Sequence, residues 1–214
     1  MNTRSMIFAL ALAALAFSPA VSLAQEQSIP PTGRGTVQFG GSIQYFNTTY
    51  KDQGLREQTY TTTILDAEAL YFFVDRLAAG PALDYQWQNG NVLSSSDQSG
   101  HFEYGLRAAY YFSQPGNRWA PFVGAGFFLS SVTEQGYSTV LDQSMEYTQH
   151  ESTLEFRAGV AYFLNPWASV DGIIQYRSTT RTVEDAYVRD GYAPQTSLSG
   201  TDVGVSFGLS VWVK

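Results

Sequence analysis

Apolar and polar residues alternate with a period of two along most of the chain. The pattern is clearest at the end, where Val203, Val205, Phe207, Leu209, Val211 and Val213 alternate with small or polar residues. Such a period places successive side chains on opposite faces of a β-strand. The segment 201–213 is longer than the roughly five or six residues of a globular strand and matches the ~9–11 residues that a tilted strand needs to cross a bilayer.

The same alternation occurs in seven further segments, so the sequence predicts eight strands. Besides 201–213, these are residues 37–47, 64–73, 82–87, 102–112, 122–132, 153–164 and 168–177. The faces of segment 122–132 are the least distinct, because aromatic residues fall on both of them.

The predicted connections are alternately short and long. Residues 74–81, 113–121 and 165–167 form brief links rich in turn residues, whereas residues 48–63, 88–101, 133–152 and 178–200 form long polar links. This asymmetry is typical of an all-β, eight-stranded, antiparallel up-and-down transmembrane β-barrel, with short turns on the periplasmic side and long loops outside.

The first residues have the pattern of an export signal. Residues 1–4 carry one positive charge, residues 6–17 are apolar, and small residues at 22–24 suit a signal peptidase, so we expect cleavage after Ala24. The apolar run is too short for a spanning anchor. We expect residues 25–34 to form a periplasmic leader, flexible over 25–33, and residues 35–214 to form the barrel domain.

Four segments carry a family resemblance. Residues 68–80 (EALYFFVDRLAAG), 105–112 (GLRAAYYF), 121–126 (PFVGAG) and 159–166 (GVAYFLNP) resemble the small outer-membrane β-barrel family of the OmpA membrane domain, OmpX-like proteins and opacity porins. The resemblance implies a bacterial outer-membrane location, insertion by the barrel-assembly machinery, and a structural, adhesive or immune-facing role. Such barrels commonly end on an aromatic residue, whereas this chain ends in Val213-Lys214.

Alternation alone does not say which face is inside, and a soluble lipocalin-like carrier would place the apolar face around a ligand. Small residues on the polar face and a near absence of lysine favour the membrane barrel. So do aromatic residues beside the short links, where an interfacial girdle belongs. The predicted girdle comprises Tyr71, Phe72, Phe73, Tyr110, Tyr111, Phe112, Trp119, Phe122, Tyr162, Phe163, Trp167 and Trp212.

The polar face would then fill the lumen with charged side chains. It carries Asp66, Glu68, Asp84, Glu103, Glu155, Asp171 and Asp202 together with Arg107, Arg157 and Arg177. Eight strands leave an interior just wide enough for side chains, and buried charges must pair. We expect a lumen charge network of Asp66, Glu68, Glu103, Arg107, Glu155, Arg157, Asp171 and Arg177. Its mid-depth ion pairs, among Glu68, Glu103, Arg107, Glu155 and Arg157, would plug the barrel; a narrow solute path or a gate is the alternative.

Candidate chemistry is sparse. The chain has no cysteine, and its two histidines, His101 and His150, do not by themselves make a metal-ligand set. His150 and Ser152 share one face of a possible strand, the spacing of a Ser–His pair with a carboxylate to orient the imidazole. No second catalytic motif accompanies them, so we expect no catalytic, cofactor or metal site.

The net charge of −7 and the lack of a basic patch argue against a nucleic-acid partner. We therefore predict a non-enzymatic, monomeric barrel that contacts the lipid bilayer and lipopolysaccharide. Its loops, rich in Tyr, Gln, Ser and Thr, suit an extracellular partner. A porin-like channel, a lipid-modifying enzyme and a soluble carrier are the alternatives.

Overall fold

The structure, a computed structural model, describes residues 30–50, 58–90, 99–138, 143–185 and 196–214. The predicted signal peptide, residues 1–24, and the first part of the leader lie outside the described residues. Eight strands follow one another: β1 (Val37–Tyr50), β2 (Gln58–Val74), β3 (Leu77–Gly90), β4 (Ser99–Tyr111), β5 (Trp119–Ser138), β6 (Gln143–Asn165), β7 (Ala168–Asp185) and β8 (Thr196–Val213).

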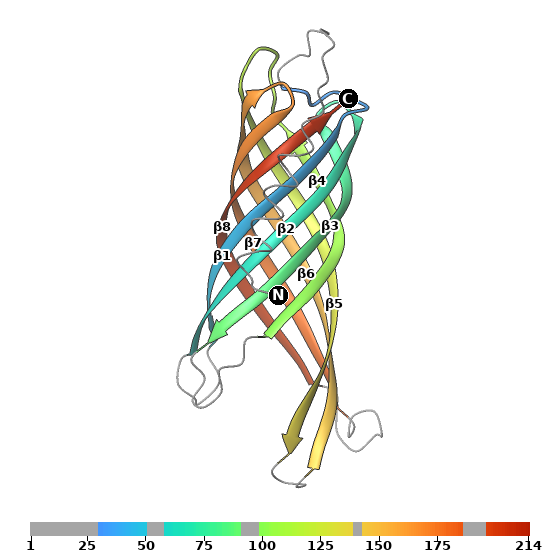
Figure 1. The fold of residues 1–214 in the computed structure, drawn as a ribbon, viewed down its shortest axis with the longest axis vertical. Coiled ribbons are helices and arrows are strands. Elements are labelled where there is room, and N and C mark those ends of the chain that lie inside the picture. Colours follow the sequence, from blue (N-terminus) through green and yellow to red (C-terminus); the bar gives the residue numbers. More distant parts are fainter. Residues whose placement is uncertain (1–29, 51–57, 91–98, 139–142, 186–195) are drawn as a thin grey trace, which may run out of the picture.

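The strands form one closed barrel (Figure 1). Each strand pairs antiparallel with the next, and β8 closes the barrel against β1, where Val37 pairs with Val213 and Phe46 with Gly204. The predicted fold class, an all-β antiparallel barrel of eight strands in sequence order, is confirmed. No helix within the described part of the chain is long and apolar enough to cross a membrane.

The barrel has a turn end and a loop end. At the turn end the connections from β2 to β3, β4 to β5 and β6 to β7 are short, and the C-terminus lies beside them (Figure 1). The predicted link 74–81 is wrong, because only Asp75 and Arg76 separate β2 from β3. Arg76 has a φ of 70°, a left-handed conformation that suits so tight a turn.

At the loop end the strands extend much farther than predicted. β5 continues to Ser138 and β6 begins at Gln143, so most of the predicted loop 133–152 is an antiparallel ladder. The loops predicted at 48–63, 88–101 and 178–200 are shortened in the same way. Side-chain alternation marks only the part of each strand whose outer face is apolar. The strands continue beyond that part because their pairing depends on backbone hydrogen bonds.

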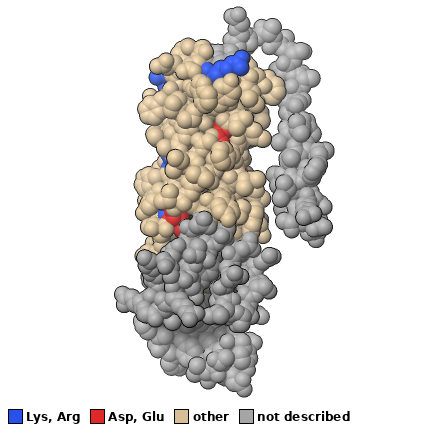
Figure 2. Space-filling view, turned by 90° about the vertical axis from the view of Figure 1, so that its left-hand side faces the viewer, with Lys and Arg blue, Asp and Glu red and all other residues tan. Residues whose placement is uncertain are grey.

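The outer face of the barrel wall is apolar, since Phe207 is 73 % exposed and Leu106 is 69 % exposed. Figure 2 shows few charged residues among the described ones on one side of this wall. In β5 the structure settles the indistinct faces: Val123, Phe127 and Leu129 point outward, whereas Phe122 and Phe128 are buried inside. The core of this protein is thus the lumen, and its apolar surface faces outward.

Candidate functional site

Arg107 of β4 is the centre of the charged half of the lumen. Its guanidinium is buried and forms a bidentate pair with Glu155 of β6, with Nε–Oε1 and Nη2–Oε2 distances of 2.9 and 3.0 Å. Nη1 also pairs with Asp66 and, at 3.0 Å, with Glu68, both from β2. Asp84 of β3 lies 3.7 Å from Nη2. One cation therefore ties three walls of the barrel together across the lumen.

Two further arginines extend this network. Arg157 of β6 forms an ion pair with Glu68, with an Nη2–Oε2 distance of 2.8 Å. Arg177 of β7 pairs with Asp84 at 3.2 Å and with Glu103 of β4. We call these three arginines and their five carboxylate partners the lumen charge network. Its members are Arg107, Arg157, Arg177, Asp66, Glu68, Asp84, Glu103 and Glu155.

The network differs from the predicted one at three residues, and the first of these is Asp84, an additional member that pairs with Arg177. Glu103 pairs with Arg177 and not with the mid-depth group around Arg107. Asp171 forms no ion pair shown within the described residues and instead accepts hydrogen bonds from the hydroxyls of Ser169, at 2.9 Å, and Ser210. The alternation identified which side chains point inward, but the choice among inward partners depends on the register between strands.

Phe128 of β5 lies between two of the arginines. Its ring centroid is 4.9 Å from the guanidinium carbon of Arg107 and 5.5 Å from that of Arg177. The ring face is electron-rich and attracts both cations. Phe128 is fully buried, so its ring also fills space in the lumen beside the charged side chains.

Five buried aromatic residues close the turn end of the lumen. We call them the aromatic plug: Phe72, Tyr111, Phe122, Phe163 and Trp212. Their ring centroids form a continuous chain with separations of 5.1 to 5.6 Å. Such tilted and edge-on arrangements are the favoured geometry for aromatic pairs.

The prediction that these five residues belong to the outer girdle is wrong. Aromatic residues occur in runs beside the turns, as in Tyr71-Phe72-Phe73 and Tyr110-Tyr111-Phe112, so adjacent members of a run face opposite sides. A run identifies the end of the barrel without saying which member enters the lumen. The pairing register decides this, because a shift of one residue reverses every side chain.

Hydrogen bonds satisfy the polar atoms of the plug. The hydroxyl of Tyr111 donates to Gln38 Oε1 at 2.7 Å, and Trp212 Nε1 donates to Ser169 Oγ at 3.1 Å. Gln38 in turn donates to Ser210 at 3.0 Å. The plug is therefore an apolar layer with a small polar layer beside it, and both layers are buried.

The other predicted girdle residues face outward near the turn end: Tyr71, Phe73, Tyr110, Phe112, Trp119, Tyr162 and Trp167. Tyr162 is half-buried because Trp119 packs against it with a centroid distance of 4.5 Å. A contact of these residues with the membrane interface remains a prediction.

Residues 30–36 pack across the mouth at the turn end. Thr32 is buried and its hydroxyl lies 2.6 Å from that of Ser113. Gly35 donates its backbone N–H to Phe72, whose own N–H donates to Thr36. Of the predicted leader, Thr32 also accepts the backbone N–H of Arg76 at 2.7 Å, so this part of it contacts the turn between β2 and β3.

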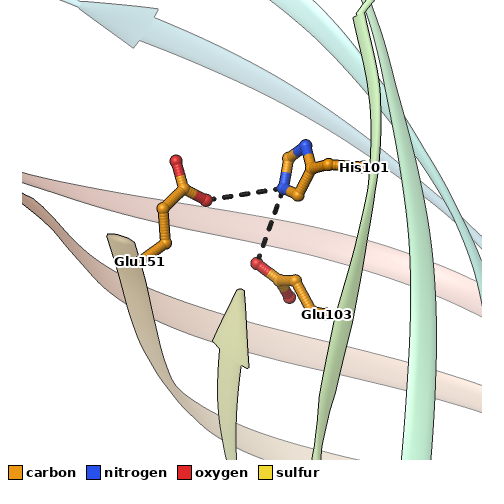
Figure 3. Close-up of side chains that lie close together, drawn as sticks. All are labelled: His101, Glu103 and Glu151. Atoms are coloured by element: carbon orange, nitrogen blue, oxygen red, sulfur yellow. Dashed lines mark ion pairs between the residues drawn. The ribbon is translucent and has the colours of Figure 1, made fainter. Parts of the chain in front are cut away.

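A further group of three ionisable residues lies in the lumen towards the loop end (Figure 3). His101 Nε2 is 3.4 Å from Glu151 Oε2 and 3.9 Å from Glu103 Oε1. From the sequence, His101 was expected to be a lone histidine without a set of metal ligands. One signal was present, because residues 101 and 103 are two apart on one strand and share its inner face.

The His150–Ser152 pair lies on the other face of β6 from this group. His150 is exposed on the outer face of β6, whereas the neighbouring Glu151 is buried and points into the lumen towards His101. Glu151 therefore cannot orient the imidazole of His150, since adjacent residues of a strand face opposite sides.

A comparison with known families matches residues 8–210 to the outer membrane protein beta-barrel domain. The chain belongs to this family. This outer-membrane barrel is therefore a protein of the bacterial outer membrane, a location that suits a closed barrel with an apolar outer wall. The soluble carrier is the alternative that this assignment overturns. No curated protein matched the chain.

Several solved structures share the fold of this outer-membrane barrel. OprG from Pseudomonas aeruginosa has a TM-score of 0.54 at 15% identity, covering 85% of this chain and 97% of that one. Escherichia coli outer membrane protein W has a TM-score of 0.54 at 16% identity, covering 84% and 98%. Neisserial surface protein A has a TM-score of 0.52 at 16% identity, covering 83% and 99%. At these identities the likeness concerns the fold alone.

Proposed function

We propose that this outer-membrane barrel is a closed, non-enzymatic membrane anchor that presents its loop end at the cell surface, in a structural or surface-interaction role. The observation that carries the proposal is the occlusion of the lumen in two successive layers. The lumen charge network fills the middle, and the aromatic plug fills the turn end. A solute would have to displace both layers to pass.

The energetics of the two layers support closure. Moving Arg107 aside would leave Asp66 and Glu155 buried without the cation that pairs with them, and breaking a buried pair costs about 3–5 kcal/mol. Opening the plug would expose large aromatic surfaces, worth ~1.5–3 kcal/mol for each buried side chain. Both layers therefore resist the side-chain motions that a narrow channel would need.

The shape of the loop end supports a role at the surface. The β5–β6 ladder runs out to the pair Ser138–Gln143, well beyond the last β4–β5 pair, Tyr104–Leu129. In Figure 1 this hairpin projects past the rest of the barrel. Neisserial surface protein A, which shares the fold, is named as a surface protein. We propose that the hairpin carries contacts with an extracellular partner, and that the apolar wall contacts lipid and lipopolysaccharide as a monomer.

Single-channel recording in planar lipid bilayers tests the closure. The purified full chain should insert and give no conductance steps, while an open porin in the same lipids gives steps. Regular steps from the inserted wild-type protein would contradict the proposal and favour the porin-like channel.

A second measurement tests the surface role. A protease-cleavable tag between β5 and β6 should be cut in intact cells, whereas the same tag after Lys214 should be cut only in lysed cells. Protection of the hairpin tag in intact cells would show that the proposed orientation is reversed. Cells whose residues 134–147 are replaced by a short turn should lose attachment to surfaces that wild-type cells bind, while barrel insertion is retained.

A further inference from the structure

The three-residue group at the loop end of the lumen has the composition of a metal site. His101 and Glu103 come from β4, and Glu151 comes from β6, with β5 between these two strands in the barrel order. One nitrogen and two carboxylate oxygens lie within 4.8 Å of one another. Figure 3 shows the imidazole of His101 aimed at both carboxylates. Among the described residues, this is the one group in which three side chains able to bind a metal converge.

The separations suit a small divalent cation. Metal–ligand bonds of ~2.0–2.2 Å in a tetrahedral zinc site place neighbouring ligand atoms about 3.4 Å apart. The separation between His101 Nε2 and Glu151 Oε2 is 3.4 Å, and that between His101 Nε2 and Glu103 Oε1 is 3.9 Å. Small side-chain rotations, which move the carboxylate oxygens by up to about 1 Å, would bring all three ligand atoms to this spacing.

Two arginines hold the carboxylates without occupying the oxygens that face His101. Arg177 pairs with Glu103 through Oε2, and Arg181 pairs with Glu151 through Oε1. The oxygens nearest to His101 are Glu103 Oε1 and Glu151 Oε2, of which the first also has a Thr153 hydroxyl at 3.4 Å. Partners on the far oxygen orient a ligating carboxylate, as outer-shell groups do in metal sites.

The nitrogen of His101 in this group lacks a well-aligned hydrogen bond. This Nε2 atom is buried and makes no hydrogen bond in the structure, although two carboxylates lie near it. A buried polar atom without a partner is costly, so such an atom calls for an explanation. The His101 side chain keeps 12 % of its surface exposed.

The charge balance of the lumen also favours a cation. Within the described residues, eight inward carboxylates face four arginines. These are Asp66, Glu68, Asp84, Glu103, Glu151, Glu155, Asp171 and Asp202 against Arg107, Arg157, Arg177 and Arg181. Buried charge needs compensation, and a divalent cation supplies it where arginines do not.

We propose that His101, Glu103 and Glu151 bind one divalent transition-metal ion, with zinc as the reference ion, in the loop end of the lumen. A set of one imidazole and two carboxylates without thiolate suits Zn²⁺ and leaves a fourth position for water. The ion would join β4 to β6 at a level where the described β4–β5 ladder has already ended at Tyr104–Leu129. Its role is to hold β4 and β6 together at the loop end of the barrel.

The test uses the full chain without a histidine tag, refolded in detergent micelles and stripped with a chelator. Isothermal titration with Zn²⁺ should show one saturable site, and Co²⁺ should give visible absorption bands of a low-coordinate site. His101→Gln and Glu151→Gln should each weaken binding by at least tenfold. His150→Gln, which alters the exposed histidine next to Glu151, is the matched control and should bind as the wild type does.

A shift in gel mobility between unheated and boiled samples checks that each variant is folded. If His101→Gln does not fold, the imidazole resonances of His101 in the wild-type protein decide the question, because Zn²⁺ should shift them and leave those of His150 unchanged. The proposal is overturned if no saturable binding occurs or if His150→Gln weakens it as much as His101→Gln. It is equally overturned if His101 remains a doubly protonated imidazolium in the presence of Zn²⁺, since the group would then be an ion-pair cluster.

Discussion

The middle and the turn end of the lumen are filled by different kinds of side chain. In the middle, Arg107 and its carboxylate partners are held by directional, charged contacts. At the turn end, the aromatic plug is held by shape and area. Removing one member of an ionic group leaves an uncompensated buried charge, whereas removing a ring leaves a cavity into which neighbours relax. A single substitution in the charged layer should therefore lower the free energy of unfolding more than a single substitution in the aromatic plug.

The largest expected effect is that of Arg107→Ala. This change leaves four buried carboxylates near an empty position, and we expect the free energy of unfolding to fall by about 3–5 kcal/mol. Urea unfolding of the barrel in lipid vesicles, followed by circular dichroism, measures it. Arg118→Ala, at an exposed arginine of the β4–β5 connection, should change stability by less than ~0.5 kcal/mol. Equal effects of the two variants would show that the network contributes little.

Next in size is Trp212→Ala, which removes the ring shared by three contacts of the aromatic plug. Deleting a buried aromatic side chain lowers the free energy of unfolding by about 3 kcal/mol or more. We expect a value near ~3 kcal/mol here, because the ends of the strands can relax into the cavity. Trp167→Ala is the matched control, because Trp167 is exposed on the outer face near the same end. A larger loss for Trp167 than for Trp212 would mean that the outer contacts, rather than the plug, stabilise the turn end.

A smaller effect is expected at Gly204, which lies under the buried ring of Phe46 towards the loop end. A β-carbon at Gly204 would come within 2.2 Å of that ring, so Gly204→Ala forces Phe46 to move. Overpacking of this kind costs about 1–3 kcal/mol. Gly172→Ala is the control, because no atom lies within 4 Å of the added carbon there. A neutral Gly204→Ala would show that the loop end of the lumen is looser than the plug.

The smallest effect is expected in the tight turn between β2 and β3, where Arg76 has a left-handed conformation. Glycine adopts this conformation without the steric cost, although it raises the entropy of the unfolded chain. We expect Arg76→Gly to stabilise the barrel by about 0.5 kcal/mol in the same unfolding experiment. A loss of stability would indicate that the Arg76 side chain contributes contacts at the mouth.

The sequence predicted much of this architecture because each of its signals is local. A period of two depends only on neighbouring residues, so it identified eight strands, their inward charges and the alternation of short and long links. It predicted the strand ends poorly. In β6, for example, the residues from Gln143 to Ser152 lack the apolar contrast yet pair with β5 through their backbone.

Partner choice within the lumen was beyond the sequence. Arg107 of β4 meets Glu155 of β6, and His101 meets Glu151, although β5 lies between their strands. Such contacts cross the interior, so they depend on the width of the closed barrel and on the register of every ladder. Neither quantity is encoded in a single strand.

What the sequence determined by itself is the barrel and its two kinds of face, because alternation within a strand separates apolar from polar side chains. The small residues of the polar face and the near absence of lysine then favoured an apolar outer wall and a charged interior. What only the tertiary structure decided is how that interior closes. Phe72, Tyr111 and Trp212 form a plug inside the barrel instead of a girdle outside it, and His101 joins two glutamates from different strands. The physical reason is closure, because β8 pairing with β1 sets the register that brings distant inward side chains into contact.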